Sequence, residues 1–257
     1  MTDKETTPDV SLVIPTYNEA KNIATLICEV NKSFEGSGAK LETIVVDDNS
    51  PDGTAEKARE LMGEYDLKVF VRENERGLAT AVQHGWQNST GKFLAVIDGD
   101  MQHPPDIILN LYKAIGEHGL DMAVASRKVE GGGTLNWEIH RMIISLVAIY
   151  IGKVMLPFTL WSVKDATTGC FMFDRNGVDL SKLSPSGFKI FLEVLVRGKF
   201  KKKREVGYVF NQRSLGESKM TIKQDVIYIY HLAKLGISTG EIAIPILIFA
   251  GFLSLIF

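Results

Sequence analysis

Two periodic patterns of apolar and polar positions alternate along the first half of the chain. Short apolar runs predict buried strands at 10–14, 41–46, 67–71, 93–97 and 122–125. Between these runs, apolar residues recur at helical spacing, which predicts a helix that opens at 18–19 and helices at 54–62, 78–86 and 106–115. Because predicted strands and helices alternate, the pattern predicts an α/β fold with a mostly parallel sheet and helices on both faces.

The regular alternation fades after Arg127, and the second half becomes richer in long apolar stretches. Residues 142–161 are largely apolar but include Lys153 and Pro157. This favours an interfacial amphipathic helix over a clean membrane span, with an ordinary buried helix as the alternative. Residues 222–237 form a second amphipathic stretch.

The end of the sequence predicts a membrane anchor. Residues 242–257 are sixteen positions without a charge, whereas a spanning helix needs roughly 20 apolar residues. The run therefore indicates either the start of a transmembrane helix or a monotopic anchor, and a buried core helix is the alternative. We expect two domains, an α/β unit over 1–220 and an interfacial and anchoring segment over 221–257.

Composition narrows the class of partners and the compartment. The formal net charge of −2 gives no general attraction for nucleic acid, so we expect no nucleic-acid partner. Two cysteines, Cys28 and Cys170, cannot build a disulfide framework, which suits a reducing compartment. Residues 1–9 are polar and contain no secretory signal. We therefore expect a membrane protein whose α/β unit faces the cytoplasm.

Carboxylates follow two of the predicted strands. Asp98 and Asp100 come after the run at 93–97, and residues i and i+2 share one side of an extended strand end. Such hard oxygen ligands suit Mg²⁺ or Mn²⁺, and a pair of solvated turn carboxylates is the alternative. Asp47 and Asp48 end another strand, where a carboxylate can bind a ribose or a base; a turn cap is the alternative. Neither a dinucleotide-binding nor a P-loop glycine motif is present.

Basic residues suggest phosphate binding. Arg127 follows a predicted strand, and Arg213 and Lys219 flank a glycine-containing loop. Guanidinium forks and ammonium groups suit diphosphates and lipid phosphates, although solvated surface charges are the alternative. The basic cluster within 197–204 suits either an anionic lipid surface or a solvated edge.

Taken together, these motifs resemble those of dolichol-phosphate mannose synthases, a group of inverting glycosyltransferases with the GT-A fold. The matching segments lie at 15–19, 46–54, 76–78, 98–105, 126–127, 165–171, 188–193 and 212–219. Gly99 departs from the commoner pattern, which has alanine there. The resemblance implies transfer of mannose from GDP-mannose to dolichyl or polyprenyl phosphate with inversion, with Mg²⁺ or Mn²⁺ as cofactor.

The resemblance also implies roles for individual residues. A pocket for the guanine nucleotide would be lined by Pro15, Tyr17, Glu19, Val46 and Asp48. The nucleotide-sugar would be met by Asp98, Gly99 and Asp100, and the metal by Asp100 and Gln102. Arg127 would lie near the transferred group, and Arg213 and Lys219 would contact phosphates from a mobile loop. Asp100, Arg127 and Arg213 are thus the expected catalytic residues.

Two other functions stay open at this point. One is transfer from UDP-glucose or another UDP-sugar to a polyprenyl phosphate. The other is a catalytically silent membrane scaffold that binds a nucleotide. The combination of the Asp98, Asp100 and Gln102 set with the Arg213–Lys219 loop favours an enzyme, because a scaffold needs no such combination.

Overall fold

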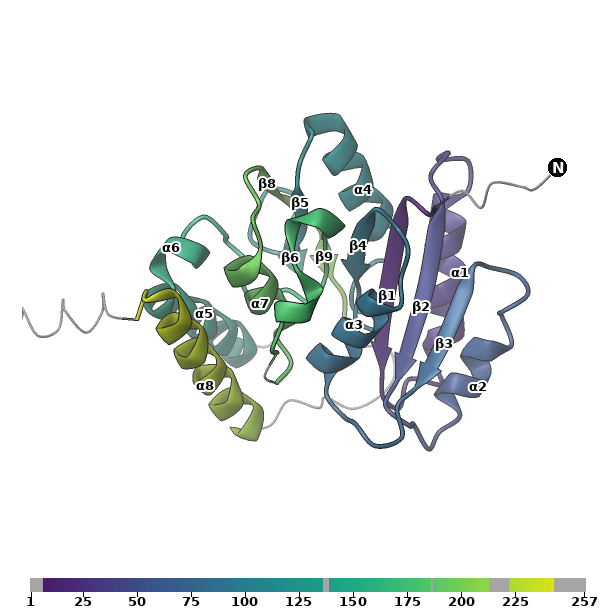
Figure 1. Cartoon of the computed structure of the whole chain (residues 1–257), viewed down its shortest axis with the longest axis horizontal. Coiled ribbons are helices and arrows are strands. Elements are labelled where there is room, and N and C mark those ends of the chain that lie inside the picture. The colour runs from purple at the N-terminus through teal and green to yellow at the C-terminus, as the bar shows by residue number, and fades with distance from the viewer. Residues whose placement is uncertain (1–6, 136–138, 186, 213–221, 243–257) are drawn as a thin grey trace, which may run out of the picture.

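A twisted sheet with helices on both faces forms the centre of the molecule (Figure 1). The computed structural model describes residues 7–135, 139–185, 187–212 and 222–242. The strands of the main sheet are β1 (Val10–Thr16), β2 (Leu41–Asp47), β3 (Leu67–Val71), β4 (Phe93–Val96), β5 (Met122–Ser126), β7 (Phe171–Asp174) and β8 (Lys203–Gly207). Their order across the sheet is β3-β2-β1-β4-β7-β5-β8. A separate pair joins β6 (Gly133–Thr134) to β9 (Val209–Phe210).

The sheet is mostly parallel, as the alternation predicted. β1 pairs in parallel with β2 and β4, β2 with β3, and β5 with β8. β7 runs antiparallel between β4 and β5, and it is the one antiparallel strand in the described part of this sheet. All five strands expected from the apolar runs are present. β1 continues two residues further than expected, through Pro15 to Thr16.

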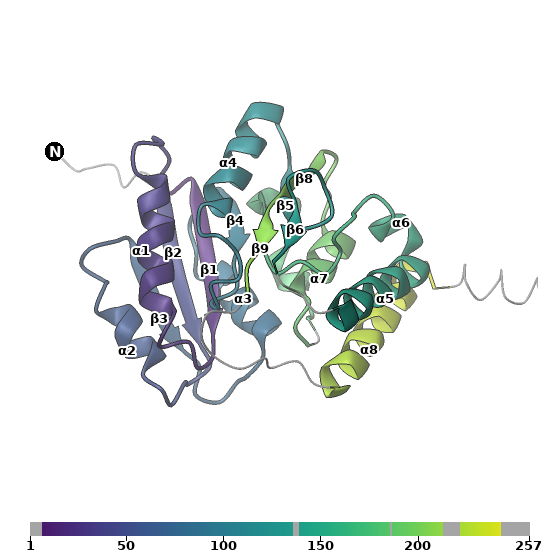
Figure 2. The same ribbon diagram turned by 180° about the vertical axis from the view of Figure 1, so that it is seen from behind.

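Helices cover the two faces of the sheet, and their bounds follow the apolar periodicity. The helices are α1 (Ile23–Phe34), α2 (Thr54–Arg59), α3 (Leu78–Gln87), α4 (Ile107–His118), α5 (Ile139–Met155), α6 (Pro157–Leu160), α7 (Ile190–Arg197) and α8 (Ile222–Thr239). Figure 2 shows α1 and α4 in front of the sheet. The stretch expected to open at 18–19 becomes helical only at Ile23, because residues 17–22 form a loop.

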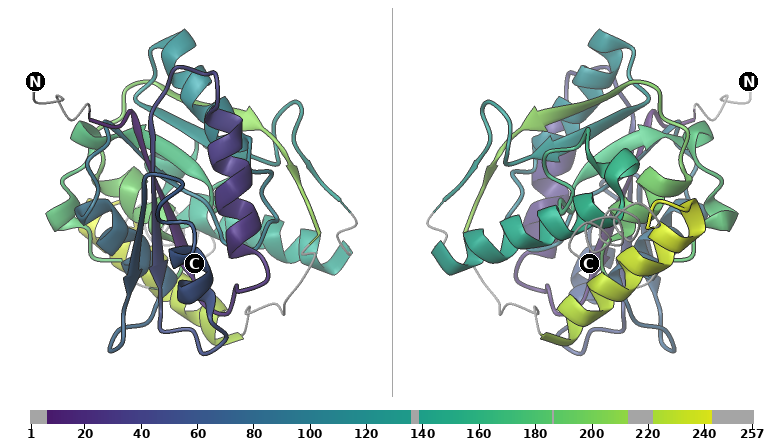
Figure 3. Two further views of the ribbon diagram at one scale, coloured as in Figure 1. Left: turned by 90° about the vertical axis from the view of Figure 1, so that its right-hand side faces the viewer. Right: turned by 90° about the vertical axis from the view of Figure 1, so that its left-hand side faces the viewer.

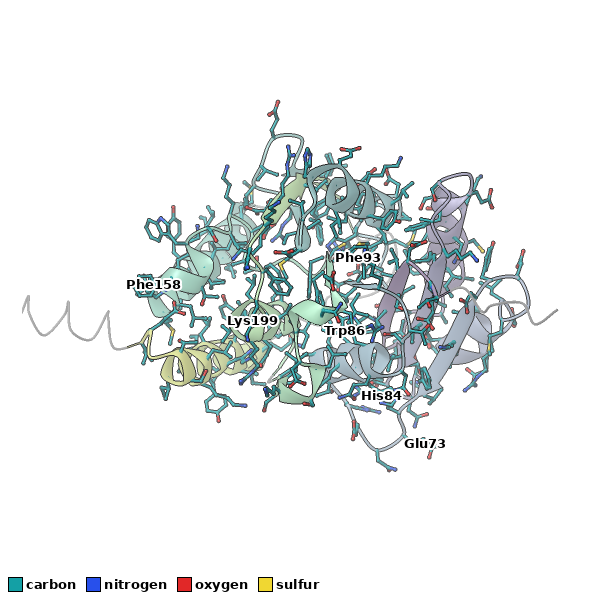
Figure 4. The ribbon with its side chains drawn as sticks, turned by 45° about the horizontal axis from the view of Figure 1, so that its top comes forward. Glu73, His84, Trp86, Phe93, Phe158 and Lys199 are labelled. Carbon is teal, nitrogen blue, oxygen red and sulfur yellow. The ribbon has the colours of Figure 1, made fainter. Side chains whose placement is uncertain are left out.

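Alternation along the strands builds a hydrophobic core on each face. Leu12 and Ile14 of β1 pack with the apolar side of α1 and α4, whereas Val13 points to the opposite core with α3 and α7. Trp86 of α3 lies at the centre of that second core, where its indole contacts Phe173 edge-on and donates a hydrogen bond to the Ala95 carbonyl (Figure 4). The site loops therefore rest on a rigid, well-packed sheet.

The helices α5, α6 and α8 form an additional layer beyond α7, and α5 and α8 lie side by side (Figures 2 and 3). Their outer surface carries exposed apolar side chains from Met142, Ile143, Ile144, Leu146, Val147, Tyr150, Val154, Phe158, Trp161, Val226, Ile229, Tyr230 and Ile237. Among the described residues, none of the helices is both long and apolar enough to cross a bilayer. The expected anchor falls at 242–257, of which 243–257 lie outside the described residues.

Candidate active site

The loops that follow β1 and β2 are joined by side-chain hydrogen bonds at the carboxyl edge of the sheet. The backbone N–H of Asn18 donates to the Ser50 hydroxyl, that of Glu19 to the Thr54 hydroxyl, and that of Ala20 to Asp52. Asn18 has a φ of 57° and Asn49 a φ of 54°, so both loops contain a residue in the left-handed region. The two expected nucleotide-pocket loops thus form one preorganised unit.

Within this unit, Asp47 and Asp48 have different tasks. Asp47 is buried and accepts hydrogen bonds from the hydroxyls of Thr16 and Ser50, so it serves the turn. Asp48 receives two hydrogen bonds from the buried guanidinium of Arg72, and its other oxygen accepts the Gly77 N–H at 2.7 Å. Asp48 therefore holds the 72–77 segment against the end of β2.

The expected pocket residues come together around this unit. Pro15 and Val46 are register partners at the ends of β1 and β2. The guanidinium of Arg76 lies 4.9 Å from the centre of the Tyr17 ring, and buried Glu19 accepts a hydrogen bond from the Asn22 side chain. The structure thus brings all five predicted pocket residues to one edge of the sheet.

The acidic segment after β4 is a turn and not the extended strand end that the spacing argument assumed. β4 ends at Val96, Gly99 and Asp100 form a turn, and Met101 has a φ of 60°. A methionine in the left-handed region is strained, and such strain is held by surrounding contacts. Here the Asp100 carboxylate accepts the Gln102 N–H at 3.1 Å.

Gln102 is fixed from the opposite side by the segment after β9. Its side-chain nitrogen donates to the Asn211 carbonyl at 3.1 Å, and the Asn211 N–H donates to the Gln102 carbonyl at 2.8 Å. This pairing uses the amide nitrogen of the side chain and leaves the amide oxygen, the group that can bind a hard cation, oriented by the same contact. No group of three or more His, Cys, Asp or Glu side chains with metal-binding geometry occurs among the described residues.

Gly169 leaves the space that the Asp98 carboxylate occupies, and Gly99 lies close to the end of β1. A Cβ on Gly169 would lie 2.2 Å from the Asp98 Oδ2 atom, so only glycine fits there without displacement. A Cβ on Gly99 would lie 3.2 Å from the Thr16 methyl carbon, a close contact that a small shift relieves. Beneath Asp98 lies His103, and burial lowers the pKa of its imidazole to about 4. At neutral pH this ring is therefore uncharged.

Arg127 at the end of β5 is bound by Asp165. Its Nε and one terminal nitrogen each donate to a different Asp165 oxygen at 2.7 Å, and its backbone N–H donates to the same carboxylate. Burial alone would raise the pKa of Asp165, but the hydrogen bonds and charge of Arg127 outweigh it and lower that pKa. The guanidinium also contacts the Phe210 ring, so its orientation is fixed.

Some candidate functional residues were not predicted from the sequence, and two predicted residues cannot be placed in the structure. Arg72 had been assigned no role, and Asp165, Gly169 and Lys189 appeared only within motifs of the resemblance. Their signal is weak because each acts through a partner far away in sequence. Arg213 and Lys219 lie outside the described residues.

Comparisons with known proteins agree with this architecture. The sequence model of the family described as glycosyl transferase family 2 matches residues 11–180. A dolichol-phosphate mannosyltransferase of Pyrococcus furiosus is 41% identical over 91% of this chain, which spans 65% of that relative's length. Proteins of the same name from Mycosarcoma maydis and Saccharomyces cerevisiae are 32% and 31% identical, covering 89% and 88% of this chain and 79% and 86% of their own lengths.

Solved structures share the fold at low sequence identity. Glucosyl-3-phosphoglycerate synthase from Mycobacterium tuberculosis, in complex with Mn²⁺, UDP and glucosyl-3-phosphoglycerate, superimposes with a TM-score of 0.63. The match covers 90% of this chain and 79% of that one at 16% identity. The likeness supports the GT-A architecture of the sheet and its helices.

Proposed function

This chain belongs to glycosyl transferase family 2, and we propose that it transfers mannose from GDP-mannose to a dolichyl or other polyprenyl phosphate, with inversion at the anomeric carbon. The observation that carries the proposal is the 41% identity to a dolichol-phosphate mannosyltransferase, which extends over 91% of this chain. The joined loops after β1 and β2 suit a nucleotide, and the turn after β4 suits the diphosphate and sugar.

The proposed reaction needs no strong general base from the protein. A phosphate monoester acceptor is already anionic at neutral pH, so its oxygen attacks the anomeric carbon while the bond to the GDP oxygen breaks. The difficulty is to bring two anions together, which requires fixed positive charge. Arg127, oriented by Asp165, supplies one such charge near the sugar. Arg213 and Lys219 are proposed to supply further charge toward the phosphates.

We propose Asp100 and Gln102 as ligands of a divalent cation, Mg²⁺ or Mn²⁺. The donor set fits, because a carboxylate and an amide oxygen are hard ligands and both side chains are positioned by the 98–102 turn and Asn211. The Mycobacterium tuberculosis synthase of the same fold was solved with Mn²⁺. A cation there would stabilise the negative charge that develops on the leaving diphosphate.

Replacing Asp100 tests this assignment. Asp100→Asn keeps the shape of the side chain but removes its charge, so we expect kcat to fall by at least about 100-fold, in the range of losing one electrostatic group of an active site. The measurement is the transfer rate with and without EDTA in the wild type and the variant. A rate that is unaffected by EDTA, or an Asp100→Asn variant of near-normal activity, contradicts the assignment.

A product assay tests the function itself. Purified protein is incubated with a polyprenyl phosphate and either radiolabelled GDP-mannose or radiolabelled UDP-glucose, and the label in the lipid phase is measured. We expect lipid-linked mannose from GDP-mannose. Label from UDP-glucose alone would favour the UDP-sugar function, and nucleotide binding without any lipid-linked product would favour a silent scaffold.

The arrangement of the chain supports membrane association of the same unit. We propose that residues 1–220 form the catalytic domain on the cytoplasmic face and that 221–257 contain the interfacial helix and the start of the anchor. The exposed apolar surface of α5, α6 and α8 lies next to the point where the uncharged run begins, at Ile242. A lipid acceptor would therefore be delivered to the same side of the molecule.

A further inference from the structure

Lys189 occupies an electrostatically unfavourable position. It is the residue that immediately precedes α7, where the helix dipole is positive, and a cation at this end destabilises a helix. Its ammonium also lies close enough to Arg127 for the two positive charges to repel each other. The lysine is half-buried, and desolvation lowers its pKa to about 8. Helix stability therefore does not explain a lysine here.

The local carboxylates leave this charge incompletely balanced. Asp98 and Asp165 both attract Lys189, but Asp165 is bound by the guanidinium and backbone of Arg127. Among the described residues, no carboxylate lies within ion-pair distance of the Lys189 ammonium, which instead donates to the Thr167 carbonyl at 2.6 Å. That carbonyl fixes the position of the ammonium but carries no full charge to neutralise it.

Lys189 also stands where the polar site meets the apolar helical layer. Gly187 approaches α8 so closely that a Cβ would lie 2.6 Å from the Ile227 side chain. Phe188 lies near the Tyr228 ring, and the Tyr228 hydroxyl donates to the Ala148 carbonyl of α5. In Figures 1 and 2, α7 lies between the sheet and the α5–α8 pair. The Lys189 ammonium lies 4.9 Å from the centre of the Phe188 ring, so Phe188 and Tyr228 connect it to α8 and α5.

We propose that Lys189 binds the phosphate of the lipid acceptor. A phosphate monoester with an apolar chain matches the local chemistry, because its head needs a cation and its chain can follow Phe188 toward α8 and α5. The expected nucleotide pocket lies at the ends of β1 and β2, whereas the Lys189 ammonium donates to Thr167, a residue that also bonds Arg127 at the end of β5. Strands β4 and β7 separate β5 from β1 in the sheet. This inference rests on the proposed function. Within it, Lys189 binds the acceptor phosphate and not the nucleotide-sugar donor.

The test compares three variants. Lys189→Gln removes the charge, Lys189→Arg keeps it, and Lys182→Gln makes the same change at an exposed lysine that pairs with Asp179. Each is assayed with GDP-mannose and a water-soluble short-chain isoprenyl phosphate, and the dissociation constants of GDP and of that phosphate are measured by calorimetry.

We expect Lys189→Gln to raise the KM and Kd for the isoprenyl phosphate about 10- to 100-fold, the factor for one lost charge-assisted hydrogen bond. The Kd for GDP should stay within about twofold, Lys189→Arg should recover most of the loss, and Lys182→Gln should behave as wild type. Weaker GDP binding with unchanged acceptor KM would overturn the inference in favour of a donor role. A lowered melting temperature with both constants unchanged would reduce Lys189 to a support for Thr167.

These measurements distinguish a wrong role for Lys189 from a wrong proposed function. If wild-type protein transfers mannose but Lys189→Gln leaves the acceptor constants unchanged, only the role of Lys189 is rejected. If the wild type neither binds nor glycosylates an isoprenyl phosphate, both the inference and the proposed function are rejected.

Discussion

Gly169 shows how a single missing methyl group positions a reactive carboxylate. Asp98 packs against the Gly169 backbone, and a Cβ there would overlap its Oδ2 atom at 2.2 Å. At Gly99, by contrast, the nearest atom to a Cβ would be the Thr16 methyl carbon, at 3.2 Å. Gly99, within the acidic turn, and Gly169, which lies against Asp98, therefore differ in what they tolerate.

We expect Gly169→Ala to lower kcat/KM by about 100-fold, because a displacement of a binding group by about 1 Å costs that much in a preorganised site. Gly99→Ala should keep activity within about threefold, since a shift of a few tenths of an ångström relieves its contact. Steady-state kinetics and thermal unfolding of both variants provide the measurement. Equal activity of the two variants would show that the Asp98 position is not critical.

At the residue scale, the sequence could predict groups that directly follow strands. Asp48, Asp98, Asp100 and Arg127 were proposed as site residues because a buried apolar run precedes each of them and the carboxyl ends of parallel strands share an edge. The partners of these residues were not found by that rule. Asp165 stands 38 positions from Arg127, so no local spacing relates the two side chains.

At the scale of elements, α8 is joined to α7 by hydrogen bonds to the buried carboxylate of Glu193. The Glu193 carboxylate accepts hydrogen bonds from the Arg197 guanidinium at 2.5 Å and pairs with the His231 imidazole of α8 at 3.0 Å. Burial by itself would raise the pKa of Glu193, but these two partners outweigh it and lower that pKa to about 2. The cluster fixes the helical layer to the catalytic unit.

The lowered pKa predicts how stability depends on pH. The carboxylate stabilises the fold above the ordinary pKa of 4.5, and this contribution is lost as pH falls from about 4.5 to 2. We expect Glu193→Gln to reduce the free energy of unfolding at pH 7 by about 3 kcal/mol, because it leaves buried partners uncompensated. The difference from wild type should shrink as pH falls through that window.

Urea unfolding at several pH values measures this, with Glu56→Gln as the matched control. Glu56 pairs with Arg59 on the exposed side of α2, and such a surface pair contributes at most about 1 kcal/mol. If the two variants lose equal stability at pH 7, the Glu193 cluster is not what joins α8 to α7.

Element prediction succeeded where periodicity was long and failed where it was short. The helices α1, α3 and α4 and the strands β1 to β5 each carry enough apolar repeats to be recognised. β7 is four residues long and follows a polar loop, so its antiparallel insertion between β4 and β5 was not predicted. Sheet order depends on contacts between distant segments, which a single apolar run does not specify.

For the whole molecule, the distribution of exposed apolar groups defines an orientation. The side chains of Phe158 and Trp161 on and after α6 are 78% and 75% exposed, and Phe158 lies at the outer edge in Figure 4. The Glu241 carboxylate accepts hydrogen bonds from the backbone N–H groups of Phe158 and Thr159. It thereby ties this aromatic surface to the residue that precedes the uncharged run, and under the proposed membrane association both would meet the same bilayer surface.

We expect the double change Phe158→Ser and Trp161→Ser to lower kcat/KM about tenfold for a long-chain polyprenyl phosphate in liposomes, because two aromatic side chains no longer enter the interface. The same variant should use a water-soluble short-chain acceptor at the wild-type rate, since neither residue lies at the reacting groups. Met62→Ser is the control, because Met62 is also exposed but follows α2 at the opposite end of the molecule (Figure 1).

An equal loss with both acceptors would mean that the aromatic pair supports the catalytic unit itself, and an equal loss in Met62→Ser would mean that any exposed apolar group contributes. A loss confined to the long-chain acceptor and to the α6 variant would place the bilayer against α5, α6 and α8, the layer that Phe188 contacts through Tyr228.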